Sequence, residues 1–128
     1  MKKVLAIRGD YQKGNEVIKI LEMLGGVNTN DYKGEQIRQF YFICPYTNVI
    51  KCVFEEAMLI TQWETHSLKS FKKEYPYKTD DKFIILDREC SIIETFWDGF
   101  TIRYKTDNGL YLMEYTAERI KELIELAK

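Results

Sequence analysis

The clearest pattern in the chain is an alternation of apolar and polar residues over its last third. Two pairs of turn residues, Asp98-Gly99 and Asn108-Gly109, interrupt this alternation, and such pairs between alternating segments are a strong signal for a β-hairpin. The pattern therefore predicts consecutive antiparallel strands that form a meander. We expect these strands at residues 82–87, 90–97, 100–106 and 110–115.

If both turns hold two residues, the pairing of the strands follows directly. The first turn places Glu94 opposite Arg103, and the second places the same Arg103 opposite Glu114. Opposite charges then meet on one face of the sheet, which stabilises it. The other face is predicted to carry two apolar rows, formed by Ile93, Tyr104 and Met113 and by Thr95, Ile102 and Tyr115.

Three segments have the apolar spacing of a helix, and each follows a residue that favours a helix start. Asn15 is the expected N-cap of the first helix, whose apolar residues continue to a glycine pair at 25–26. Ser67 precedes a short helix that Pro76 ends, and Thr116 precedes the last helix.

Short apolar runs in the first half predict three strands, the last two forming a hairpin. They lie at residues 3–7, 39–43 and 49–53. The segment 54–65 mixes residues that favour helix and strand, so its structure stays open. We expect an α+β protein with a β-α-β-β subdomain over residues 1–66 and a β subdomain with a C-terminal helix over residues 67–128.

The charge balance narrows the range of functions. The 128 residues include 19 Lys and Arg and 20 Asp and Glu, a net charge of −1, which gives no positive field for a nucleic acid. No apolar stretch approaches the roughly 20 residues of a membrane span. The odd cysteine count, with no secretory signal, fits a reducing compartment. We therefore expect a cytoplasmic protein without a membrane partner.

The loop between Gly9 and Gly14 has the glycine spacing of a phosphate-binding loop. Such a loop needs Lys and then Ser or Thr after its second glycine, to contact phosphates and magnesium. This chain has Asn15 and Glu16 at those places, and a carboxylate repels an anion. We expect no nucleotide here and no other cofactor elsewhere.

Three cysteines and one histidine supply the residue types of a zinc site, but the short Cys-x-x-Cys spacing is missing. A four-residue hairpin loop would put Cys44 and Cys52 on opposite faces of a sheet, and a three-residue loop would put them on the same face. His66 lies in a polar stretch beside a helix start, where exposure to solvent is the ordinary interpretation. We expect no metal site and no catalytic residue, and hence no enzyme.

The segment 77–83, Tyr-Lys-Thr-Asp-Asp-Lys-Phe, leads into the predicted meander. It resembles the entry into small SH3-like barrels, where a Lys-x-Gly-Asp-Lys-hydrophobic pattern opens the first strand, although Asp80 replaces the glycine. The two hairpins and the final helix also resemble such barrels. The resemblance implies a strongly bent SH3-like sheet, in a fold that binds peptides or nucleic acids or serves as a scaffold.

Three further motifs are Leu-Gly-Gly at 24–26, Tyr-Lys-Gly at 32–34 and Tyr-Pro-Tyr-Lys at 75–78. With these motifs the whole chain resembles a group of uncharacterised small proteins of gut bacteria and their phages. That resemblance implies a relation to phages or mobile elements, and it carries no functional residue with it.

Candidate binding residues come from two segments. Residues 69–78 interleave lysines with aromatic residues, a pattern with which proteins bind single-stranded nucleic acid. The predicted register also places Ile92 and Phe96 together on the outer face, as a small apolar patch for a partner. The candidate surface comprises Lys69, Lys72, Lys73, Tyr77, Ile92 and Phe96.

We therefore expect a non-enzymatic interaction module that binds a protein or peptide partner. A nucleic-acid-binding accessory protein that uses residues 69–78 is the first alternative. A small enzyme whose site the sequence does not reveal is the second. A homodimer is compatible with either binding function.

Overall fold

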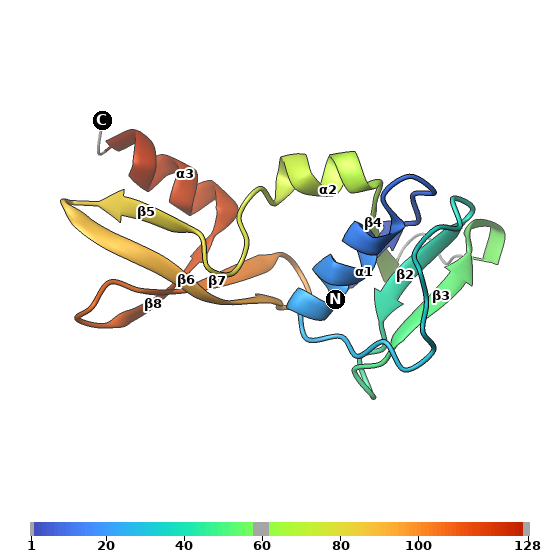
Figure 1. Cartoon of the computed structure of the whole chain (residues 1–128). Coiled ribbons are helices and arrows are strands. Elements are labelled where there is room, and N and C mark those ends of the chain that lie inside the picture. The colour runs from blue at the N-terminus through green and yellow to red at the C-terminus, as the bar shows by residue number, and fades with distance from the viewer. Residues whose placement is uncertain (1, 58–61, 127–128) are drawn as a thin grey trace. The chain divides into compact units, whose positions relative to one another are not determined.

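The computed structural model describes residues 2–57 and 62–126, and the chain divides into two compact units between Lys73 and Glu74. The expected division, between residues 66 and 67, lies seven residues earlier, so most of the helix α2 (Leu68–Glu74) belongs to the first unit. Each unit contains one four-stranded β-sheet (Figure 1). The expected α+β class is confirmed.

The sheet of the first unit has the strand order β3-β2-β1-β4. The central strand β1 pairs antiparallel with β2 and parallel with β4. The predicted hairpin of β2 and β3 is confirmed. Within the segment left open, a 3₁₀ helix and β4 are described, and residues 58–61 lie outside the described residues. The bounds are β1 Val4–Arg8, β2 Gln39–Ile43, β3 Ile50–Phe54, η1 Glu55–Ala57 and β4 Trp63–His66.

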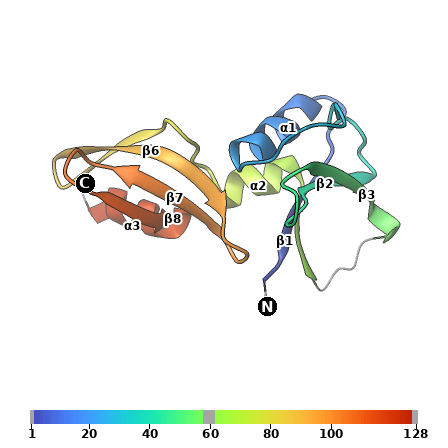
Figure 2. The ribbon, with the colours of Figure 1, turned by 90° about the horizontal axis from the view of Figure 1, so that it is seen from below.

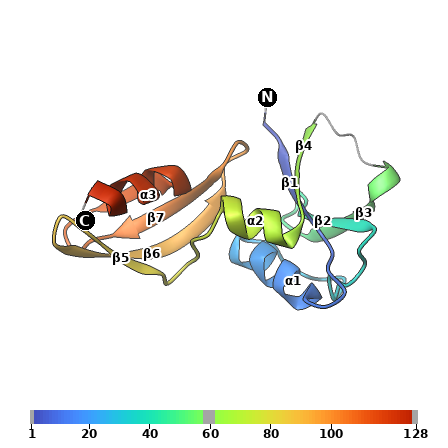
Figure 3. The ribbon, with the colours of Figure 1, turned by 90° about the horizontal axis from the view of Figure 1, so that it is seen from above.

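Helices α1 (Gly14–Met23) and α2 lie side by side in the first unit (Figures 2 and 3). An ion pair between Glu16 of α1 and Lys72 of α2 connects them. The buried side of α1 carries Val17 and Leu21, as the apolar spacing predicts. These residues join the side chains of β1 in the core of this unit.

The start of α1 differs from the prediction. The helix begins at Gly14, so Asn15 already lies inside its first turn and is not the N-cap. Asp10 organises the preceding loop instead, because its Oδ1 accepts the backbone N–H groups of Gln12 at 2.9 Å and of Lys13 at 3.2 Å. The N-cap residue is Lys13, which makes no side-chain capping hydrogen bond, so the Asp10 carboxylate holds the loop before the helix and does not cap it.

The other predicted helix boundaries are confirmed. Gly25 ends α1 with a φ of 101°, a left-handed conformation that glycine adopts without strain. Ser67 accepts the backbone N–H of Ser70 at 3.1 Å at the start of α2. Thr116 accepts the backbone N–H of Arg119 at 3.2 Å at the start of the last helix.

The second unit is an antiparallel meander with the strand order β5-β6-β7-β8, and the helix α3 lies along one face of it (Figure 1). Its edge strands β5 and β8 do not pair with each other, so the sheet is an open meander and is not closed into a barrel of the kind that the SH3-like resemblance implies. The bounds are β5 Lys82–Ile85, β6 Arg88–Trp97, β7 Ile102–Asp107, β8 Leu112–Thr116 and α3 Ala117–Leu126.

The strand register of this meander also differs from the prediction. Trp97 pairs with Ile102, and Asp107 pairs with Leu112, so each loop holds four residues rather than two. In the first loop the Oδ1 of Asp98 accepts two backbone N–H groups, at 2.8 and 2.9 Å. The second loop is held in the same way by its first residue. These side-chain hydrogen bonds stabilise the longer turn.

The longer loops move the charge pairs along the sheet. Lys105, and not Arg103, lies opposite both Glu94 and Glu114. Arg103 instead contacts Asp98, with 2.9 Å between Nε and Oδ2. Partial burial opposes the ionisation of Asp98, but its hydrogen bonds from Arg103 and from the loop backbone outweigh that effect and lower its pKa.

A β-bulge at Ile93 changes which residues of β6 face the core. The pairing shifts between Ile92 and Glu94, so the alternation of the strand is interrupted there. As a result Ile92 is fully buried, whereas Ile93 is 45% exposed. The prediction that Ile92 faces outward with Phe96 is therefore wrong. Phe96 lies half-buried on the other face, opposite Arg103.

We expect a double-mutant cycle between Glu94 and Lys105 to give a favourable coupling of about 0.2–1 kcal/mol, because the two side chains face each other across strands. Alanine substitutions and urea unfolding measure this free energy. The same cycle between Glu94 and Arg103 is the matched control and should give a smaller coupling, because Arg103 lies diagonally from Glu94 and pairs with Asp98. A coupling found only in the control would support two-residue turns instead.

A second prediction concerns Tyr104, which is fully buried. Among the described residues its hydroxyl has no hydrogen-bond partner. Burial raises the pKa of Tyr104 well above its ordinary value. Since the folded state has the higher pKa, the stability contributed by the neutral phenol is present below about pH 10 and is lost at higher pH.

We therefore expect Tyr104→Phe to change the free energy of unfolding at neutral pH by less than about 1 kcal/mol, and in the stabilising direction. The variant should also lose less stability than the wild type between neutral pH and about pH 11. Urea unfolding at both pH values measures this difference. Tyr46→Phe, at an exposed site, is the control and should follow the wild type. An equal alkaline loss in Tyr104→Phe would contradict the prediction.

Candidate interaction surface

The six predicted binding residues lie in different environments. Ile92 is buried in the core of the second unit. Tyr77 is half-buried, and its ring packs edge-on against that of Tyr104, with 5.8 Å between the ring centroids. Phe96 is half-buried on the face of the sheet opposite to the one that carries Ile92. The exposed residues of the set are Lys69, Lys72 and Lys73, which lie on α2.

The contacts of residues 69–78 do not favour nucleic-acid binding. Lys72 pairs with Glu16, and this hydrogen bond lowers the pKa of Glu16. Phe71 and Tyr75 are buried, so their ring faces are covered. Base stacking requires exposed aromatic faces beside the basic residues. In this segment the side chains exposed to a nucleic acid are mainly those of the lysines.

Several exposed apolar residues of the second unit lie at one end of it, although Phe100 is also exposed in the β6–β7 loop at the opposite end. The β5–β6 and β7–β8 turns lie at the same end of the meander, and the C-terminal end of α3 lies there too (Figure 1). We call this end the apolar tip. Its exposed apolar residues are Leu86, Leu110, Tyr111, Leu112 and Leu126, each between 52% and 84% exposed.

Leu86 is a residue of the apolar tip with an unfavourable backbone conformation. Leu86 and Asp87 form the two-residue turn between β5 and β6, with φ values of 50° and 63°. Asn and Gly are favoured at such positions, because a residue with a larger side chain is strained at positive φ. An exposed leucine gains no burial there in return. Strain of this kind often marks a functional surface.

Strand β8 is an edge of the sheet, and among the described residues it pairs with β7 alone. In the loop before it, the Asn108 N–H donates to the Tyr111 carbonyl at 3.5 Å. Since hydrogen bonding alternates along an antiparallel pair, Leu112, Glu114 and Thr116 direct their backbone N–H and C=O groups away from β7. Many edge strands carry lysine or proline, which block pairing with another chain. Strand β8 contains neither.

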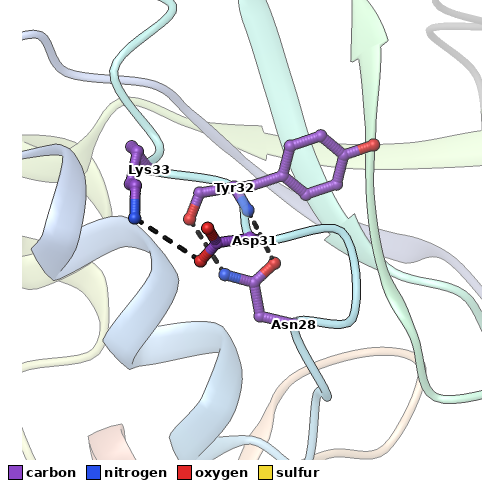
Figure 4. Close-up of polar contacts among 4 residues, drawn as sticks. All are labelled: Asn28, Asp31, Tyr32 and Lys33. Atoms are coloured by element: carbon purple, nitrogen blue, oxygen red, sulfur yellow. Dashed lines mark hydrogen bonds and ion pairs between the residues drawn. The ribbon is translucent and has the colours of Figure 1, made fainter.

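In the first unit, the segment 27–34 is held by side-chain hydrogen bonds (Figure 4). The Asn28 amide donates to the Tyr32 carbonyl at 2.9 Å and accepts the Tyr32 N–H at 3.0 Å. Asp31 and Lys33 form an ion pair at 3.4 Å. The Tyr32 ring points away from this cluster, and the neighbouring Cys52 thiol and then burial raise the pKa of Tyr32. This segment is therefore a rigid border of the unit.

The glycine loop at residues 9–14 packs against this border. A Cβ atom on Gly9 would lie 2.3 Å from the carbonyl oxygen of Gln36. One on Gly14 would lie 2.5 Å from the carbonyl oxygen of Lys33. Glycine is therefore required for the close approach of two backbone segments. The carbonyl oxygens that lie against these glycines carry partial negative charge. They therefore make this loop unfavourable for binding a phosphate.

The cysteines are separated. Cys52 lies opposite Tyr41, and the hairpin register puts Cys44 and Cys52 on opposite faces of the sheet. The Thr47 hydroxyl and the loop backbone lower the pKa of the Cys44 thiol, whereas burial raises that of Cys90. In residues 2–57 and 62–126, no three His, Cys, Asp or Glu side chains are grouped to hold a metal ion.

His66 is not the solvent-exposed side chain that the sequence analysis expects. Only 11% of its side chain is exposed, and its Nε2 lies 2.9 Å from Oε2 of Glu64. Its Nδ1 lies 2.9 Å from Oγ of Ser70. Sequence reasoning missed this group because β4 was not predicted. Recognising a strand there would have placed Glu64 and His66 on one face.

Comparison of the chain with protein-family models, curated proteins and solved structures finds no match in any of the three. None of the helices in the described part of the chain is both long and apolar enough to span a bilayer. A functional assignment therefore depends on the arrangement of the described residues.

We expect Leu86→Asn to raise the free energy of unfolding by about 0.5–1 kcal/mol, because asparagine adopts positive φ at lower cost. Urea and thermal unfolding test this change. Leu110→Asn is the matched control at another exposed leucine and should change stability by less than about 0.5 kcal/mol. A clear loss of stability in Leu86→Asn would mean that the leucine is held by packing.

Proposed function

We propose that the protein is an interaction module whose second unit binds an extended segment of a partner protein along the outer edge of β8. The observation that carries this proposal is the outer edge of β8, which is unpaired among the described residues and contains no lysine or proline, beside the apolar tip. An added strand would form main-chain hydrogen bonds with β8, and the exposed apolar residues would add burial. Peptide binding is also among the uses that the SH3-like resemblance implies.

The charges of the sheet favour a basic residue in the partner segment. Glu94, Lys105 and Glu114 form a row of alternating charge that ends at β8. A residue on an added strand opposite Glu114 continues this row, and a lysine or arginine there keeps the alternation. On the other face, the neighbours of the added strand are Met113 and Tyr115. The preferred segment therefore alternates apolar and basic residues.

The test uses the full chain and a synthetic peptide in which valine and lysine alternate. We expect saturable changes in the NMR signals of the β8 backbone amides, with a Kd of about 10–100 µM, as for a weak peptide complex. Binding should weaken with added salt. Changes confined to other strands, or no binding at millimolar peptide, would contradict the proposal.

We expect Glu114→Lys to weaken binding of this peptide at least about tenfold and to favour a peptide that alternates valine and glutamate. Glu118→Lys makes the same change of charge at an exposed position of α3 and is the control. If both variants lose affinity equally, the net charge and not the β8 row determines binding.

A further inference from the structure

We propose that Ser70 is a nucleophile for acyl transfer, with His66 as its general base and Glu64 as the residue that orients the histidine. This inference concerns the first unit and is independent of the β8 proposal. It also opposes the expectation that the chain has no catalytic residue. The observation behind it is the juxtaposition of these three side chains at the junction of β4 and α2.

The geometry defines the role of each group. Glu64 accepts a hydrogen bond from Nε2 of His66 at 2.9 Å, which keeps the ring proton on that nitrogen. The lone pair of Nδ1 then faces Oγ of Ser70, 2.9 Å away, and can accept the hydroxyl proton. A nucleophile, a base within hydrogen-bond reach and a third group that orients the base follow the general logic of an activated serine, with the two ring nitrogens in exchanged roles relative to the Ser-His-Asp triad.

The fold holds these groups in place. Glu64 and His66 alternate along β4 and so share one face of the sheet. The His66 ring packs edge-on against the buried Phe71, with 6.1 Å between the ring centroids. Ser67 caps the helix by accepting the backbone N–H of Ser70. The base is thus largely shielded while Ser70 is exposed and open to a substrate.

The surrounding charges indicate the class of substrate. Lys69 and Lys73 are exposed on the same short helix as Ser70. Lys73 lies three residues after Ser70, so the two side chains are neighbours on the helix surface. An ammonium group there attracts a negatively charged substrate and can stabilise an oxyanion. We infer that the substrate is an ester that carries a negative charge.

The reaction proceeds in two balanced steps. The Ser70 Oγ forms a bond with the ester carbonyl carbon while its proton passes to Nδ1 of His66, and the leaving alcohol takes that proton as its bond breaks. Water then attacks the acyl carbon while His66 accepts a proton from it, and the bond from that carbon to Oγ of Ser70 breaks as His66 returns the proton to Oγ. The products are the free acid and the alcohol.

The first experiment treats the full chain with a fluorophosphonate reagent, which forms an Oγ–P bond and releases fluoride. We expect Ser70 to be labelled at least about tenfold faster than Ser67, an exposed serine in the same chain, because general-base assistance contributes about 10²–10⁴-fold. Mass spectrometry of the intact chain and of its peptides identifies the labelled residue. Equal labelling of both serines would overturn the proposal.

Variants then test the role of each partner. His66→Gln should slow labelling of Ser70 at least about tenfold, and Glu64→Gln should slow it less. In the wild type, labelling should also slow in acid, because a protonated imidazole accepts no proton. This pH dependence tests the base even if a variant unfolds. If acid leaves the labelling rate of Ser70 in the wild type unchanged, the proposal is overturned. The same holds if a folded His66→Gln variant is labelled as fast as the wild type.

The substrate class is tested with two 4-nitrophenyl esters, the neutral acetate and the negatively charged hemisuccinate. We expect the Ser70-dependent release of nitrophenol, which is the rate above that of Ser70→Ala, to be faster for the charged ester, since the hemisuccinate also hydrolyses by itself through its own carboxylate. Lys73→Glu should slow the charged ester at least about tenfold more than the neutral one, as electrostatic stabilisation is lost for the anion alone. Equal effects on both esters would overturn the assignment of an anionic substrate, and Ser70→Ala defines the background rate.

Discussion

The hydrogen bonds from Asp98 and Asn108 to the backbone of their own loops determine the geometry of the second unit. In each loop a side-chain oxygen accepts the N–H groups two and three residues further along, which holds four residues in the turn. A shift of two residues keeps each side chain on its face but changes its partner. Lys105 therefore lies between Glu94 and Glu114, and the charged row reaches the outer edge of the sheet with a carboxylate.

Several features of the same unit lower its stability without an evident structural gain. Leu86 has a positive φ, apolar side chains of the apolar tip face solvent, and β8 carries no lysine or proline. Selection for stability alone would favour asparagine or glycine in the turn and a protected edge. Binding of another chain would cover the apolar side chains and pair the edge, which is why we assign the interaction to this end of the unit.

The first unit is organised differently, through close backbone contacts and local hydrogen bonds. Gly9 and Gly14 allow one loop to approach another, and Asn28 holds the segment around Tyr32. A reactive group must be held in place by its neighbours, since a small displacement of a base or nucleophile removes its effect. At the junction of β4 and α2, hydrogen bonds with Glu64 and Ser70 hold the His66 ring. Chemistry and binding are thus proposed for separate units.

The sequence by itself determined the features that depend on neighbours within a few residues. These include the end of α1 at Gly25, the helix starts at Ser67 and Thr116, and the β2–β3 hairpin. Tertiary structure alone decided the parallel pairing of β4, the bulge at Ile93 and the open sheet. A bulge or a longer turn leaves the apolar pattern almost unchanged, yet it moves every later partner. Pairings between distant strands depend on packing that no local pattern encodes.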